Sequence, residues 1–172
     1  MNETTDYSAK YLVALQKGRN NLLMVAGLTV LNIILYYAQS TITFPFSAFL
    51  PQAAVAIGLE GEYVTGSPIF LVLGIFLAVL VIGFYVASAL LSKKRPGWFI
   101  AALIMFLIDT GILLWFCFPG FEVESLIDIA FHCWVLYYLV RAVIARSKLK
   151  LIAEQPAQVE SAEGVAQGEV QA

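Results

Sequence analysis

The chain has 172 residues, of which 60% are hydrophobic and 13% charged, with a formal net charge of -2 at pH 7. Soluble domains are nearer about half apolar and about a quarter charged, so lipid rather than water must solvate much of this surface. Because no basic patch is interleaved with aromatic residues, nucleic-acid binding has no support.

The basic residues fall into three groups that hydrophobic blocks separate. Between the groups lie two long loops that carry acids only. By the positive-inside rule this arrangement predicts four crossings of the cytoplasmic (inner) membrane, with both termini in the cytoplasm. The groups are Lys10, Lys17 and Arg19, then residues 93–95, then Arg141, Arg146, Lys148 and Lys150.

Residues 1–19 are predicted to form a cytoplasmic amphipathic segment on the inner membrane surface, because Tyr7, Tyr11 and Leu15 recur at four-residue spacing. A frayed terminus is the alternative. The first span is expected at about 20–39, since about 20 residues cross about 30 Å of hydrocarbon. We interpret it as an uncleaved anchor, because its apolar run is longer than the core of a signal peptide.

The segment 44–58 is apolar but short, and it contains Pro45 and Pro51. If it crossed the membrane, the bases at 93–95 would lie outside, against the positive-inside rule. We therefore expect an interfacial or re-entrant segment on the outer leaflet, bent or folded as a hairpin. The sequence Leu59–Gly66 is expected to be an acidic external loop.

Three further spans are predicted at 68–91, 96–118 and 125–145. Ser67 is a suitable N-cap for the second span and Pro68 suits its first turn. An acidic turn is expected at 121–124, before the fourth span.

The predicted fold is therefore all-α: an up-down-up-down four-helix transmembrane bundle over residues 20–145, with the outer-leaflet segment between the first two spans. The tail, 146–172, is basic and then acidic, and it is expected to be disordered in the cytoplasm.

Ionisable residues inside a span cost about 2.5–3.5 kcal/mol at the centre and normally face the bundle interior. Such residues are Asp109 in the third span and Asp128 and His132 in the fourth, and Asn32 in the first span belongs with them. Counted from the span ends, Asn32, Asp109 and His132 lie at similar depths in the outer half, with Asp128 one turn further out. We expect Asn32, Asp109 and His132 to approach one another.

The first span adds a polar stripe, which should face the other helices. The stripe consists of Asn21, Thr29, Asn32, Tyr36 and Gln39. The candidate polar cluster or binding pocket is accordingly Asn32, Tyr36, Gln39, Asp109, Asp128 and His132.

This cluster has two interpretations. In the structural one, Asp109 or Asp128 pairs with His132 and Asn32 donates to a carboxylate, which fixes the register of the helices. In the functional one, a pocket open to the outside binds a proton or a small substrate, because His beside Asp can relay protons near neutral pH.

Small residues in the second span suggest two packing faces. Gly74 with Ala78, and Gly83 with Ala87, form small-xxx-small pairs on opposite sides of the helix. Both pairs could pack within one protomer, or one could pack against a second copy.

Six stretches carry a resemblance to known sequences: Asn20–Leu23, Thr29–Ile33, Phe46–Pro51, Pro96–Trp98, Ile108–Thr110 and His132–Tyr138. With these stretches the chain resembles a family of small four-span bacterial membrane proteins of uncharacterised function, and the resemblance implies the fold and no activity.

No motif names an activity. The single His and the lack of a paired nucleophile argue against an enzyme, and no catalytic residue, metal or cofactor is predicted. We expect a non-enzymatic accessory or interaction subunit, whose partners are the lipid bilayer and a second copy or another membrane protein. The alternative is a proton-coupled carrier of small substrates, or a membrane protein that binds a small ligand or lipid.

Overall fold

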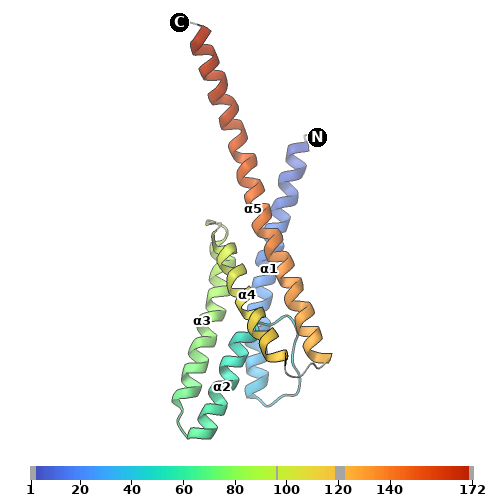
Figure 1. Ribbon diagram of the computed structural model, residues 1–172, viewed down its shortest axis with the longest axis vertical. Coiled ribbons are helices and arrows are strands. Elements are labelled where there is room, and N and C mark those ends of the chain that lie inside the picture. The colour runs from blue at the N-terminus through green and yellow to red at the C-terminus, as the bar shows by residue number, and fades with distance from the viewer. Residues whose placement is uncertain (1–2, 96, 119–122, 171–172) are drawn as a thin grey trace.

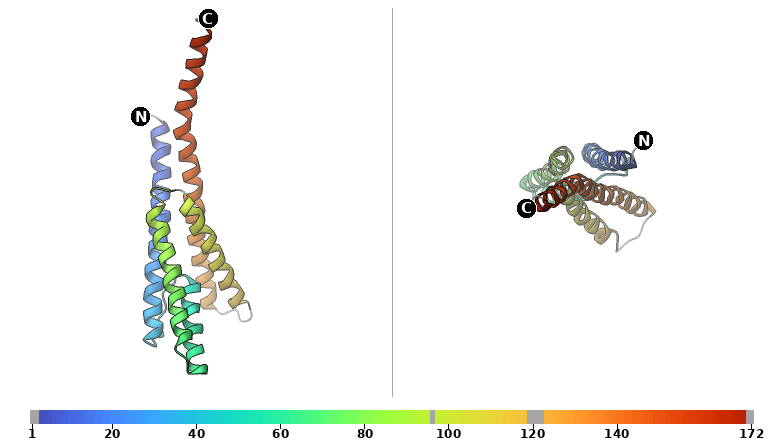
Figure 2. Two further views of the ribbon diagram at one scale, coloured as in Figure 1. Left: turned by 90° about the vertical axis from the view of Figure 1, so that its left-hand side faces the viewer. Right: turned by 90° about the horizontal axis from the view of Figure 1, so that it is seen from above.

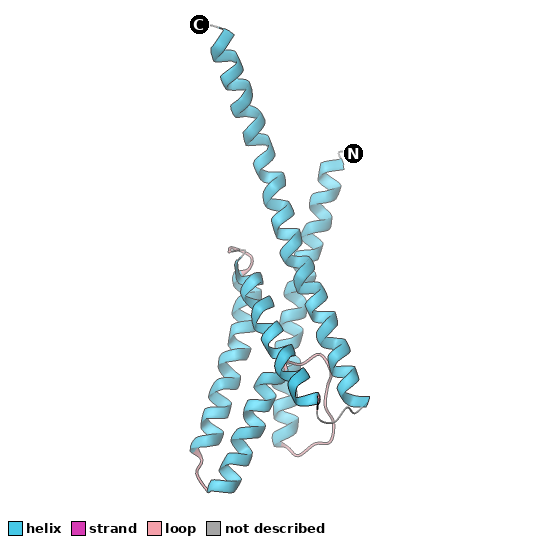
Figure 3. Cartoon of the chain, in the orientation of Figure 1, coloured by secondary structure: helices cyan, strands magenta, loops and turns pink. Residues whose placement is uncertain are grey.

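The computed structural model describes residues 3–95, 97–118 and 123–170, and the side chains of 8–95, 97–118 and 125–153. Within these residues the chain is helical and contains no strand, as Figure 3 shows, so the predicted all-α class is confirmed. The helices are α1 (Glu3–Tyr37), α2 (Phe49–Thr65), α3 (Ile69–Leu91), α4 (Gly97–Cys117) and α5 (Val123–Val170).

Four helical stretches are long and apolar enough to cross a membrane, which agrees with the predicted four-span bundle. In Figures 1 and 2 the two chain termini lie toward one end of the molecule, and the turn between α2 and α3 lies at the other. The α3–α4 turn is on the side of the termini, as an up-down-up-down order requires. The four stretches are Ser8–Tyr37, Ile69–Leu91, Gly97–Cys117 and Ser125–Ala153.

The N-terminal segment differs from its prediction, because α1 is one continuous helix and residues 4–17 form no separate surface helix. The reason is packing against α5. A Cβ atom on Gly18 would lie only 2.7 Å from the Cβ of Ala142, so the two backbones approach closely there. Leu15 and Leu22 are buried on either side of this contact. The apolar face of the first span thus continues toward the N-terminus.

The C-terminal tail also differs from its prediction, because α5 continues as a helix to Val170 instead of ending near residue 145. The tail is rich in Ala, Glu and Gln, which are good helix formers. Extending a helix that the fourth span has already nucleated costs far less than starting a new one.

Pro96 and residues 121–122 of the expected acidic turn lie outside the described residues.

The segment between the first two candidate spans turns back into the helical bundle, and residues 38–65 are called the re-entrant segment for this reason. After Tyr37 the chain turns back without helical structure, and α2 begins at Phe49 and runs beside α3 to Thr65 (Figure 1). The expected loop 59–66 is therefore wrong, since all but its last residue is helical. Gly66 ends α2 in the left-handed conformation, with φ 68°, and its N–H donates to the carbonyl of Glu62 at 2.8 Å.

Helices α2 and α3 pack closely because glycines line their contact. A Cβ atom on Gly74 would collide with the carbonyl of Ala54, and one on Gly58 would lie 2.7 Å from the carbonyl oxygen of Phe70. Of the two small-residue pairs predicted on α3, the one with Gly74 packs inside the protomer. Gly83 of the other pair has no atom within 4 Å of its added Cβ position.

Candidate functional site

Helix α2 begins inside the bundle, and a carboxylate from another helix caps it. Its N-cap residue, Ala48, has no side chain that can accept a hydrogen bond, so the first N–H groups need outside acceptors. Asp109 of α4 supplies them: Oδ2 accepts from the N–H of Phe49 at 3.0 Å and Oδ1 from the N–H of Leu50 at 2.6 Å. The next residue, Pro51, has no N–H. The oxygens of Asp109 carry negative charge, and they lie at the N-terminus of α2, where the helix dipole is positive.

The extended chain before α2 is held by two polar side chains of α1. The N–H of Ala48 donates to the hydroxyl of Thr29 at 2.8 Å. The amide of Asn32 pairs with the peptide of Phe44 as a neighbouring strand would, donating to its carbonyl at 2.7 Å and accepting from its N–H at 2.8 Å. Asn32 also donates to the hydroxyl of Ser47 at 2.9 Å.

These contacts satisfy the polar groups of the non-helical chain inside the helical bundle. Non-helical backbone at membrane depth is tolerated only where protein or a wet cavity satisfies its polar groups. Thr29, Asn32 and Asp109 do this for the chain that leads into α2, and all three side chains are buried. The polar residues of the first and third spans therefore fasten the re-entrant segment inside the bundle.

Asp109 also contacts His132 of α5, with Nε2 3.0 Å from Oδ2. The other ring nitrogen, Nδ1, lies 2.8 Å from the carbonyl oxygen of Asp128, which can only accept, so Nδ1 carries a proton. The contact with Asp109 then needs one more proton, on the imidazole or on the carboxyl group. Either placement leaves the pair without net charge, which lowers the cost of burying it.

Helical periodicity explains why these two side chains face inward. On α4 Asp109 continues the buried row of Ala102 and Phe106, and on α5 His132 begins the buried row that includes Val135. The ring of Phe106 stacks on that of His132 at a centroid distance of 5.1 Å. The apolar faces of both helices thus orient the polar pair.

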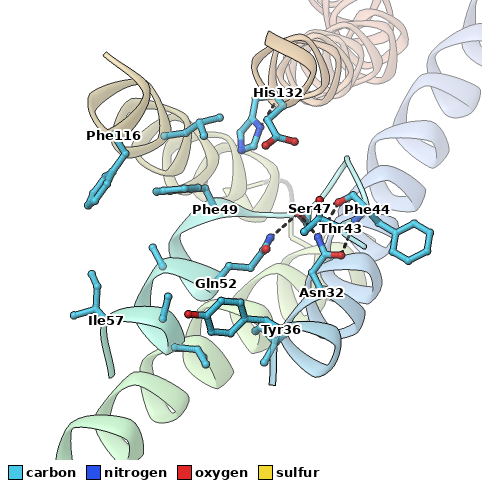
Figure 4. Close-up of a pocket in the computed structure, with 16 residues that line it drawn as sticks. Asn32, Tyr36, Thr43, Phe44, Ser47, Phe49, Gln52, Ile57, Phe116 and His132 are labelled. Atoms are coloured by element: carbon cyan, nitrogen blue, oxygen red, sulfur yellow. Dashed lines mark hydrogen bonds between the residues drawn. The ribbon is translucent and has the colours of Figure 1, made fainter. Parts of the chain in front are cut away.

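A pocket of about 450 Å³ lies beside this assembly, between the re-entrant segment and helices α1, α4 and α5 (Figure 4). Its wall combines hydrogen-bonding groups with aromatic and aliphatic ones. The polar lining residues are Asn32, Tyr36, Thr43, Ser47, Gln52, Asp128 and His132, and the apolar ones are Ile33, Phe44, Phe49, Ala53, Val55, Ala56, Ile57, Leu113 and Phe116.

The structure brings together most of the residues that the sequence singled out. Asn32, Tyr36, Asp128 and His132 line the pocket, and Asp109 is bonded to His132. Gln39 is exposed and is not among the lining residues, because the chain turns there, with φ 55°.

The expected bond from Asn32 to a carboxylate is wrong. Its amide donates to Phe44 and Ser47, because the extended backbone of the re-entrant segment lies between α1 and the two ionisable side chains.

Sequence reasoning missed three polar pocket residues, Thr43, Ser47 and Gln52, and the last two bond to each other. The side-chain N–H of Gln52 donates to the hydroxyl of Ser47 at 2.6 Å, and this hydroxyl also accepts from Asn32. The available signal was their polarity within an otherwise apolar run, flanking Pro51. Thr29 was placed on the polar stripe of α1, but its bond to the backbone of the re-entrant segment was not foreseen.

The described side chains include no group of three or more His, Cys, Asp or Glu residues arranged to hold a metal ion. Comparison with known proteins finds no matching family model, no matching curated protein and no matching solved structure.

Proposed function

We propose that this is a non-enzymatic membrane protein that binds a small amphipathic molecule in the pocket between the re-entrant segment and helices α1, α4 and α5, which we call the outer pocket. The observation that carries the proposal is the pocket itself, whose volume of about 450 Å³ falls within the range of about 300–1,000 Å³ that small-molecule sites occupy. Its lining combines hydrogen-bonding side chains with aromatic and aliphatic ones. This division suits a ligand with a polar head and an apolar body.

The cluster beneath the pocket supports binding by a preformed site over proton-coupled transport. The Asp109 side chain is fully buried, and each of its oxygens accepts a backbone N–H. A carrier would need to load and release a proton there, which would disturb the cap of α2. An acid that holds the pocket wall in place suits a rigid site, because preorganisation reduces the cost of binding.

The distribution of charge supports an orientation in the cytoplasmic membrane, with both termini and the α3–α4 turn inside. Lys93, Lys94 and Arg95 are exposed at that turn, toward the end of the molecule that carries the termini. Glu60 and Glu62 lie on α2 near the opposite end. This separation follows the positive-inside rule, and it supports a location of the ligand pocket in the outer half of the membrane.

Blocking the pocket tests the proposal. Ala56 lines the pocket and Ala130 of α5 is an exposed residue outside its lining, so Ala56→Trp and Ala130→Trp are matched changes. The chain is purified in a mild detergent, and the small molecules that remain bound are extracted and identified by mass spectrometry. We expect one amphipathic compound to accompany the wild type and Ala130→Trp and to be depleted at least about tenfold in Ala56→Trp. Equal extracts from all three folded proteins would contradict the proposal.

A further inference from the structure

A second pocket lies at the other end of the bundle, where the chain carries its bases. Its volume is about 570 Å³, and it lies between the first turn of α4 and the segment of α5 from Val143 to Ala153. Ile100, Val143 and Leu149 form part of its wall, and Arg146 and Lys150 provide its charges. Among the residues whose side chains the structure describes, no acid lines this pocket.

The two bases belong to one face of α5. Arg146 and Lys150 are four residues apart, so they project to the same side of the helix. Arg146 is half-buried and Lys150 is exposed, an arrangement in which apolar stems cover the pocket while the charged heads reach the boundary of the membrane. Ser147, between them, adds a hydroxyl whose proton goes to the carbonyl of Val143 at 3.3 Å and whose oxygen can still accept.

The position of this pocket relates its charge to the bilayer. Ile100 and Val143 lie on the apolar stretches of α4 and α5, and Arg146 and Lys150 follow Val143 toward the C-terminus, on the side of the exposed bases at 93–95 that precede α4. The pocket therefore has an apolar part at the level of lipid chains and a cationic part at the level of headgroups. Basic pockets between helices on the cytoplasmic side are suited to anionic headgroups.

We infer that this inner pocket binds one acidic phospholipid, with its phosphate against Arg146 and Lys150 and an acyl chain along Ile100 and Val143. A free phosphate ion would use only the two bases. The apolar wall is what favours a lipid. The site lies at the opposite end of the bundle from the outer pocket, and the inference does not depend on what that pocket binds.

Native mass spectrometry of the full chain in detergent tests the site, with dioleoylphosphatidylglycerol and dioleoylphosphatidylcholine as probes. Removing both charges in Arg146→Gln/Lys150→Gln should weaken the first bound phosphatidylglycerol roughly thirtyfold, which corresponds to about 1 kcal/mol for each base near a membrane surface. Lys10→Gln/Lys17→Gln removes the same charge from exposed positions on α1 and should change binding less than about twofold.

One further variant and one competition experiment complete the test. Val143→Trp fills the pocket and keeps both bases, so it should also abolish the tight site, even if the doubly neutralised variant fails to fold. Inorganic phosphate at millimolar concentration should not displace the lipid. Equal binding of the two lipids, unchanged binding by Val143→Trp, or displacement by inorganic phosphate alone would overturn the inference.

Discussion

The replacement Asp109→Asn tests the role of the buried acid, because it keeps the shape of the side chain and removes one acceptor. The carboxylate accepts the N–H of Phe49 on one oxygen and that of Leu50 on the other. An amide has a single oxygen, so one of these N–H groups must face an NH₂ group in either rotamer. The change therefore removes at least one bond from the first turn of α2, whichever way the amide turns.

The size of the effect follows from burial. A buried donor that loses its acceptor costs about 1–3 kcal/mol, and Asp109 has no exposed surface. We expect the free energy of unfolding to fall by about that amount. His132 also contacts Oδ2, and either amide atom in that place limits this contact: an oxygen cannot donate to an unprotonated Nε2, and an NH₂ group cannot accept from a protonated one.

The measurement is equilibrium unfolding in mixed micelles at rising dodecyl sulfate fraction, followed by circular dichroism. Hydrogen exchange at Phe49 and Leu50 should accelerate in the same variant, since these amides lose protection first. The control is Glu60→Gln, which removes a charge from an exposed position on α2 and should change stability by less than about 0.5 kcal/mol. Wild-type stability and wild-type exchange in Asp109→Asn would refute the capping role.

Two other substitutions probe the core. Tyr85 is fully buried on α3 and its hydroxyl has no hydrogen-bond partner among the described residues, so Tyr85→Phe should leave thermal stability unchanged or raise it; a loss above about 1 kcal/mol would show that the hydroxyl is bonded. Gly74→Val should destabilise the chain by about 1–3 kcal/mol, because its side chain would collide with the carbonyl of Ala54. Gly83→Val is the control, since its side chain would face open space on the same helix. Equal effects of the two substitutions in a melting assay would contradict this packing.

The spans could be predicted because lipid leaves a strong mark on sequence. A run such as 69–91 contains no charge at all, and only a membrane or a large core accepts it. Buried ionisable residues are also conspicuous, which is why depth indicated Asp109 and His132 as neighbours, although Asp128 remained an alternative partner for His132. The helical periodicity indicated that both side chains face the bundle interior, since each lies on a row of buried apolar residues.

The re-entrant segment could be recognised by its length and prolines, but its contacts could not. The acceptors of the α2 amides come from Thr29, nineteen residues before Ala48, and from Asp109, sixty residues after Phe49. Such long-range hydrogen bonds leave no local pattern. The continuity of α1 through its N-terminal part was missed for a related reason, because the contact of Gly18 with Ala142 joins the first and last helices of the chain.

The central claim is that the chain between α1 and α3 enters and leaves the bundle on one side of the membrane. Single cysteines at Thr41 and Tyr63, both exposed, flank the inserted part, and Lys94 lies on the α3–α4 turn. In a background without Cys117 and Cys133, a membrane-impermeant maleimide should label positions 41 and 63 in intact cells. It should label position 94 only after the inner face is opened. Labelling of positions 41 and 63 from opposite sides would show that α2 crosses the membrane and would contradict the account.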